Sequence, residues 1–174
     1  MKYLVKIFVV TFFLIICTYA SADQKVAFID MTYILNNSKA GKNAQDYLKK
    51  TFEQNQKKYL DEENKLKSDE NNLLSKKSEL SKEEYTLKAN ELRKRVMDHQ
   101  AKRRASLDKI AKQRIDARKV LLEKLDPIIK QYVDDNGISL VVDKKIVFAG
   151  KADLDITNSI VEKLNKELPS LDLK

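Results

Sequence analysis

The chain has 174 residues and a formal net charge of +8, and 34% of its residues are charged. It contains only three glycines, two prolines and no tryptophan. This composition argues against a compact globule and favours long, exposed helices. The single cysteine, Cys17, excludes an intrachain disulfide.

Residues 1–22 have the pattern of a secretory signal peptide. Lys2 and Lys6 flank the start, residues 7–17 are almost wholly apolar, and residues 20–22 have the A-x-A form of a cleavage site. The apolar run is shorter than the roughly 20 residues of a membrane span. Cleavage removes two lysines and lowers the charge from +8 to about +6, which favours acidic partners. We therefore expect an exported protein.

Residues 25–30 form a short apolar run rich in strand-forming residues, which predicts a buried strand. Residues 31–37 are expected to connect this strand, through a helical turn, to a long helix that Asn37 or Ser38 can cap. That helix, over residues 42–77, contains neither proline nor glycine. Its apolar residues recur every seven positions, which indicates a coiled-coil seam: Phe52, Tyr59, Leu66, Leu73 and Leu80. The positions four residues further on are polar, so the seam is thin: it has one apolar residue in every seven where a coiled coil normally has two.

Ser81 and Glu84 have the spacing of a capping box, which predicts that the chain reverses there into a second helix over residues 82–133. Its apolar positions are Leu87, Leu92, Val96, Ala101, Ala105, Ile110, Ile115, Leu122 and Ile129. Pro127 is expected to kink this helix, or to end and restart it. Gly137 suits the left-handed position that ends a helix.

Two strand-like runs, 138–142 and 146–149, surround a polar stretch and predict a β-hairpin. Asp155 can cap a last amphipathic helix that Pro169 terminates. The predicted fold is therefore α+β, with a base from residues 23–37 and 134–174 and a helical hairpin arm over residues 38–133. Three short strands and one helix make a small core with open sheet edges, so we expect self-association through the base.

Several segments together resemble the Skp/OmpH family of periplasmic chaperones. They are KVAFIDM at residues 25–31, the long charged helical pair, GISLVVD at residues 137–143, and DIT at residues 155–157 with LN at residues 164–165. The resemblance covers the mature chain in order. It implies a jellyfish-like homotrimer with a central β-barrel and projecting tentacles, which binds unfolded outer-membrane proteins without nucleotide or metal. By this analogy the strands mediate oligomerisation through Val26, Phe28, Ile29, Ile138, Leu140, Val142 and Val147.

The segment of residues 88–119 contains twelve basic and four acidic residues, a net charge of +8. Some of these cations belong to a solvated helix face with ion pairs to the other helix. The alternative is an electropositive surface that steers acidic clients or anionic headgroups, including lipopolysaccharide. The densest clusters are our candidate client-binding residues: Arg93, Lys94, Arg95, Lys102, Arg103 and Arg104. Scattered apolar residues of the arm serve either the seam or the client: Tyr59, Leu66, Leu73, Leu87, Leu92, Val96 and Met97.

Catalytic chemistry finds little support in the sequence. His99 is the sole histidine, and one histidine without cysteine makes no zinc cluster. The position of Asp143 is more typical of a turn residue than of a catalytic carboxylate. Ser139 has no residue nearby in sequence that could act as its general base. No glycine-rich phosphate loop is present. We therefore expect neither an enzyme nor a cofactor, but a holdase chaperone or, alternatively, an envelope coiled-coil tether that binds anionic lipid or one fixed partner.

Overall fold

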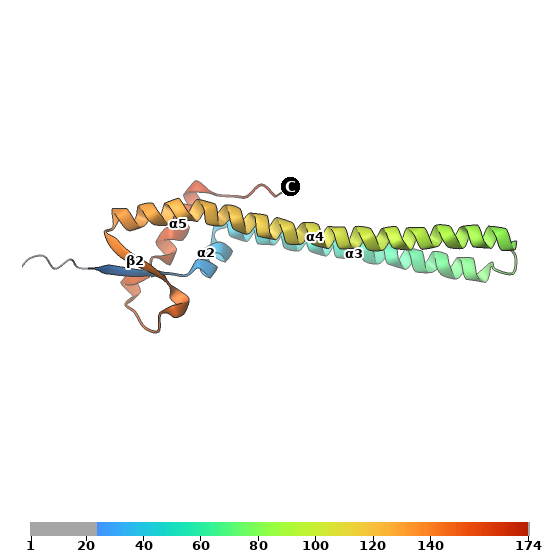
Figure 1. Ribbon diagram of the computed structural model, residues 1–174, viewed down its shortest axis with the longest axis horizontal. Coiled ribbons are helices and arrows are strands. Elements are labelled where there is room, and N and C mark those ends of the chain that lie inside the picture. Colours follow the sequence, from blue (N-terminus) through green and yellow to red (C-terminus); the bar gives the residue numbers. More distant parts are fainter. Residues whose placement is uncertain (1–23, 174) are drawn as a thin grey trace, which may run out of the picture.

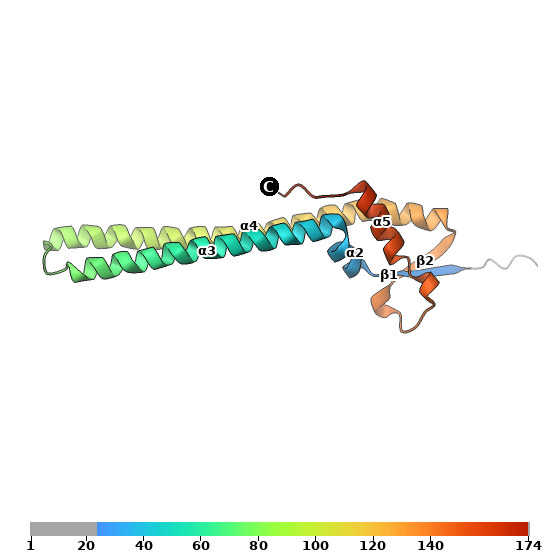
Figure 2. The same cartoon turned by 180° about the vertical axis from the view of Figure 1, so that it is seen from behind.

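The structure, a computed structural model, describes residues 24–173, so the predicted signal peptide lies outside the described residues. The molecule is elongated: a helical hairpin projects from one side of a small base (Figure 1). The hairpin consists of α3 (Lys39–Ser75) and α4 (Lys82–Asp135). At 1.5 Å per residue these helices extend about 55 and 81 Å, and they run side by side in both views (Figures 1 and 2).

Local capping explains where the arm helices begin. Ser38 caps α3, because its side chain accepts a hydrogen bond from the backbone N–H of Gly41. Gly41 is required there, since a Cβ atom at this position would overlap the carbonyl oxygen of Leu35. At the far end the capping box is confirmed: Ser81 N–H donates to Glu84 at 3.1 Å, and Glu84 N–H donates to Ser81 Oγ at 3.2 Å. The Ser81 hydroxyl, which donates to Glu84 Oε2 at 2.8 Å, and the Ser81 N–H together hold the pKa of the Glu84 carboxyl group below its usual value.

Helix α4 runs without interruption through Pro127, so the expectation that the helix ends and restarts there is wrong. Proline cannot donate to the carbonyl of Glu123, one turn back. Both residues are exposed, so water can satisfy the carbonyl that is left free. The helix ends instead at Asn136 and Gly137, and Gly137 has the predicted left-handed backbone with φ of 60°.

The sheet of the described residues has two parallel strands, β1 (Lys25–Ile29) and β2 (Ile138–Asp143). The β-hairpin predicted around residues 143–145 is wrong. The side chain of Asp143 accepts from the backbone N–H of Lys145 at 2.9 Å and turns the chain into a 3₁₀ helix, Lys144–Ile146. Residues 147–151 then form a loop that leads to a second 3₁₀ helix, Ala152–Leu154, so Val147 lies outside any strand.

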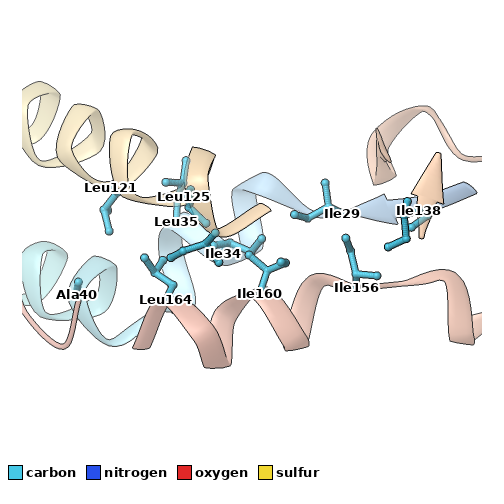
Figure 3. Close-up of a cluster of buried hydrophobic side chains, with 12 residues drawn as sticks. Ile29, Ile34, Leu35, Ala40, Leu121, Leu125, Ile138, Ile156, Ile160 and Leu164 are labelled. Carbon is cyan, nitrogen blue, oxygen red and sulfur yellow. The ribbon is translucent and has the colours of Figure 1, made fainter. Parts of the chain in front are cut away.

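The core lies where the arm enters the base. Two further helices, α2 (Met31–Asn37) and α5 (Thr157–Glu167), pack beside the end of α4 and the sheet (Figure 3). The region predicted as a connection is thus mostly helix α2. Five side chains of this core are almost completely buried: Ile34, Leu125, Ile128, Ile160 and Leu164. Each contributes about 1.5–3 kcal/mol by leaving water, so this cluster holds base and arm together.

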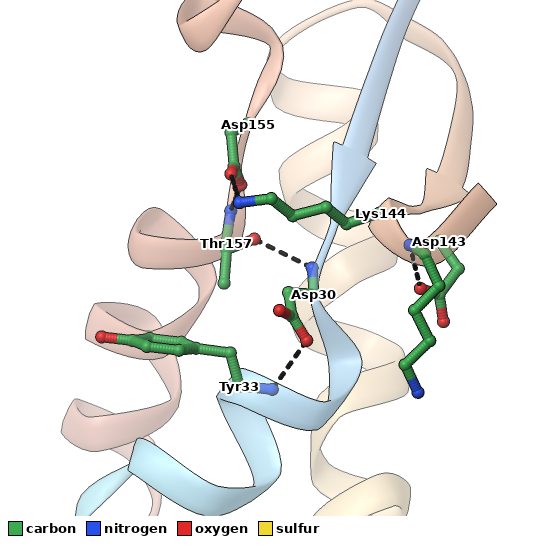
Figure 4. Close-up of polar contacts among 7 residues, drawn as sticks. Asp30, Tyr33, Asp143, Lys144, Asp155 and Thr157 are labelled. Atoms are coloured by element: carbon green, nitrogen blue, oxygen red, sulfur yellow. Dashed lines mark hydrogen bonds and ion pairs between the residues drawn. The ribbon is translucent and has the colours of Figure 1, made fainter. Parts of the chain in front are cut away.

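A polar cluster ties β1 to α5 on the surface of the base (Figure 4). The backbone N–H of Asp30 donates to Thr157 Oγ1 at 2.9 Å, and Lys144 Nζ lies 2.7 Å from an oxygen of Asp155. Asp155 does not occupy the cap position of α5, which is Ile156, but its Oδ1 accepts from the backbone N–H of Thr157 at 3.0 Å. Partial burial raises the pKa of Asp155, but the hydrogen bonds from Lys144 and Thr157 outweigh it and hold that pKa below its usual value.

A carboxylate whose pKa is lowered in the folded state contributes stability above its unfolded pKa and loses it as the pH falls through the folded value. Asp155→Asn keeps the acceptor for Thr157 and removes only the charge. We expect its destabilisation, measured by urea unfolding, to be present at pH 6 and to fade as the pH falls below the ordinary range of a carboxyl group and through the lowered pKa of Asp155. The exposed Asp153→Asn is the matched control, and an Asp155→Asn effect that is independent of pH contradicts the assignment.

Candidate functional site

The inner face of α4 follows a coiled-coil pattern along the arm. Its half-buried and buried positions recur in alternating steps of four and three, interrupted only at position 103: Tyr85, Ala89, Leu92, Val96, His99, Ser106, Ile110, Gln113 and Ala117. On α3 the predicted seven-residue spacing is confirmed for Tyr59, Leu66 and Leu73, which are half-buried, but the second seam position lies three residues further on. That position holds Glu62 and Asp69, so the seam is thin and polar.

The prediction that Phe52 belongs to the seam is wrong, because Phe52 is exposed. Thr51 and Asn55 take its place, since α3 turns a different face inward near the base. Leu87, Ala101, Ala105, Ile115 and Leu122 of α4 are likewise exposed. Fewer apolar residues than expected therefore hold the two helices together.

Polar bonds between the helices supplement this thin seam. Asn55 Nδ2 donates to Ser106 Oγ at 2.8 Å, and the Tyr59 hydroxyl donates to the backbone carbonyl of Lys102 at 3.2 Å. Nearer the tip, Arg95 and Asp69 form an ion pair at 2.7 Å. Such partly exposed contacts contribute only about 0.2–1 kcal/mol each, so they set the register of the helices more than they stabilise the arm.

His99 is buried in this seam rather than placed in a cleft. Its Nε2 lies 3.0 Å from the carbonyl oxygen of Tyr59, and its ring meets the Tyr59 ring edge to face with centroids 5.8 Å apart. Asp143 caps a 3₁₀ helix, and Ser139 is exposed on β2. Among residues 24–173 no three histidine, cysteine or acidic side chains are grouped closely enough to hold a metal ion.

The six candidate cations all lie exposed on α4. The structure brings them into two clusters about two turns apart, Arg93 to Arg95 and Lys102 to Arg104. Arg95 is engaged with Asp69, and Arg93 donates to Asn90 at 3.2 Å. Arg103 lies close enough to Glu63 to assist Lys67, the main cause, in lowering the pKa of that carboxyl group. No ion pair of the described chain involves Lys94, Lys102 or Arg104.

The scattered apolar residues of the arm divide into two groups. Five are half-buried in the seam: Tyr59, Leu66, Leu73, Leu92 and Val96. Leu87 and Met97 are 68% and 69% exposed, so they do not serve the seam. Met97 lies between the two cationic clusters, which places an accessible apolar side chain among uncompensated positive charges.

The seven residues expected to mediate oligomerisation do not share one environment. Phe28, Ile29 and Ile138 are buried in the core of the chain itself, and Val142 and Val147 are half-buried. Only Val26 and Leu140 are exposed. Ile146 and Phe148 belong to the run 146–149 that was expected to form a strand; both are exposed, and Phe148 is fully exposed in the loop that follows the 3₁₀ helix.

No helix in the described part of the chain combines the length and the apolar composition that crossing a bilayer would take. The fold defines a class of protein in which an antiparallel helical arm projects from a small α/β base. A family model described as outer membrane protein (OmpH-like) matches residues 25–164, and the chain belongs to this family.

A solved structure has the same fold. It is the crystal structure of a protein from Caulobacter crescentus described as an OmpH-like outer membrane chaperone, and it superimposes with a TM-score of 0.80 at 20% sequence identity. The match covers 89% of this chain and 92% of the other. A search of curated proteins found no match.

The thin seam predicts that the tip half of the arm opens locally more often than its root. Backbone amides of residues 66–101 should exchange with deuterium faster than those of residues 121–128, where α4 enters the core. Residues 85–101 and 121–128 both lie in α4, so the comparison of these two segments controls for intrinsic helix stability. Equal protection of the two segments, measured by hydrogen exchange with mass spectrometry, would contradict the weakness of the seam.

Proposed function

We propose that this protein is an ATP-independent periplasmic holdase chaperone that binds unfolded outer-membrane proteins, prevents their aggregation and helps deliver them to the outer membrane. The observation that carries the proposal is the surface of the arm, where uncompensated cations surround exposed apolar side chains such as Met97. Membership of the OmpH-like family and the fold shared with a protein described as an outer membrane chaperone support this role.

The physics of the arm suits binding without a fixed register. Charge contacts on an exposed helix are individually weak but act at long range, so they favour fast capture of acidic segments. Exposed apolar groups such as Leu87 then add short-range attraction. A weakly packed arm can adjust to different chains, which promiscuous binding requires. Anionic lipid or lipopolysaccharide headgroups would meet the same cationic clusters, and none of this requires a nucleotide or a metal.

The base is proposed to assemble into a homotrimer whose strands build a barrel. The exposed Ile146, Phe148 and Leu140 support this, because exposed apolar side chains on so small a base are costly unless covered. One edge of β2 has no partner strand among the described residues, and open edges favour pairing with another chain. Several arms would then enclose one client.

The alternative function is an envelope tether, in which the arm binds one folded partner or anionic lipid. The long hairpin alone would serve that role equally well. The two functions differ in their response to unfolded chains, because a tether binds one partner saturably and is indifferent to them.

The mature protein should suppress aggregation of an outer-membrane β-barrel protein diluted from urea, at stoichiometric amounts and without nucleotide. Light scattering measures the suppression, and an equal mass of an unrelated helical protein controls for crowding. Scattering that is unchanged by the protein, together with saturable binding to a folded envelope partner, would favour the tether.

Charge reversal of Arg93, Lys94, Arg103 and Arg104 to glutamate should slow client capture severalfold and reduce its salt dependence, because long-range attraction is screened by salt. Stopped-flow fluorescence of a labelled client at low and high ionic strength measures both effects. Reversal of four lysines at the base end, Lys124, Lys130, Lys151 and Lys166, changes the net charge equally. Equal slowing by both variants would assign the effect to overall charge rather than to the clusters.

A further inference from the structure

A groove of about 530 Å³ lies between α3 and α4 at the root of the arm. We call it the arm-root groove; its floor is formed by Gly41, Ala44, Leu48, Ala117 and Leu121. It adjoins the core through Leu121 and through Leu35, which Figure 3 shows beside Leu125. The groove lies away from the two cationic clusters, which are nearer the tip.

The groove exists because three facing positions carry almost no side chain. Gly41 and Ala44 on α3 face Ala117 on α4, so space remains between the larger Leu48 and Leu121. Gly41 cannot be enlarged, because the carbonyl oxygen of Leu35 occupies the place of a Cβ atom. The close approach of Gly41 to the Leu35 carbonyl therefore keeps this part of the groove free of a side chain.

The rim of the groove is cationic. Lys49, Arg114 and Arg118 line it against the single acidic residue Asp46. None of these three cations takes part in an ion pair within the described residues. The other polar side chains of the rim, Asn36 and Gln45, bond to each other at 2.8 Å. The groove thus offers apolar surface and two guanidinium groups, whose planar fork suits carboxylates.

Exposed apolar residues extend this surface along α4. Ile115 lies three residues before Arg118, and Leu122 lies four residues after it. Leu107 lies seven residues before Arg114. These spacings place the three apolar residues on one flank of the helix. All three are exposed. An extended chain seated in the groove can therefore continue over the outer face of α4.

We infer that the arm-root groove binds a short extended segment of an unfolded polypeptide in which apolar and acidic residues alternate. Alternation places the apolar side chains toward the floor and the carboxylates toward the cationic rim. The stretch of α3 that lines the groove, from residue 41 to residue 49, spans about 12 Å of helix, which matches three or four extended residues. The groove is open along the flank of the arm, so a long chain can enter from the side. This inference rests on the proposed holdase function.

The test uses the full mature protein and a fluorescein-labelled peptide of alternating leucine and aspartate, with binding measured by fluorescence anisotropy. The double substitution Arg114→Ser and Arg118→Ser should weaken binding about tenfold or more, the loss expected when a charge-assisted contact is removed. Lys112→Ser and Lys119→Ser remove the same charge from exposed positions outside the groove lining and should leave binding within about twofold. Peptides with serine for leucine or asparagine for aspartate should each bind more weakly.

A wild-type protein that suppresses client aggregation but does not bind the peptide would overturn the groove assignment and leave the holdase function intact. Equal weakening by the two double variants would also overturn it, because the peptide then senses only net charge. Failure to suppress aggregation would instead refute the proposed function on which the groove's role rests. Selective loss with Arg114→Ser and Arg118→Ser, at unchanged thermal stability, supports the inference.

Discussion

The burial of Leu125 and Ile128 at the end of α4 is the interaction on which the rest of the structure depends. These side chains lie in one cluster with Ile34 of α2 and Ile160 of α5, so a single helix belongs both to the arm and to the core. The arm cannot supply this stability itself, because its seam pairs half-buried leucines with Glu62 and Asp69. A long helix with a partly polar seam stays folded here because one of its ends is packed into the buried hydrophobic cluster.

Local signals in the sequence predicted the parts of the fold that depend on local chemistry. The capping box at Ser81, the left-handed Gly137 and the seven-residue spacing from Tyr59 to Leu73 all reflect interactions within a few turns of one helix. The wrong β-hairpin prediction has both a local and a long-range cause. Residues 146–149 have the composition of a strand, but the side chain of Asp143 bends the chain into a 3₁₀ helix, and β2 pairs in parallel with β1 instead.

In the candidate site, too, some features follow from local sequence and others depend on how the helices pack. The exposure of the cationic clusters follows from charge alone and was predictable. Whether an apolar residue faces the seam depends on how each helix is rotated about its own axis. A seven-residue repeat alone does not show whether the second seam position lies three or four residues after the first. Phe52 was therefore misplaced and His99, a lone histidine among charges, proved to be buried. The arm-root groove depends on Gly41 and Ala117 meeting across two helices, which no local pattern encodes.

The arm therefore has two ends with different physical properties. Near the tip the seam is thin, with half-buried apolar residues alternating with polar ones, and cations and apolar side chains such as Met97 lie exposed beside it. At the root the helices pack into the core, and the groove lies beside Leu121, which belongs to that core. On the proposed function, a client chain held at the tip would keep its freedom, whereas a segment seated at the root would lose it and would have to offset that entropy with specific contacts. Arg114 and Arg118 are the groups positioned to provide them.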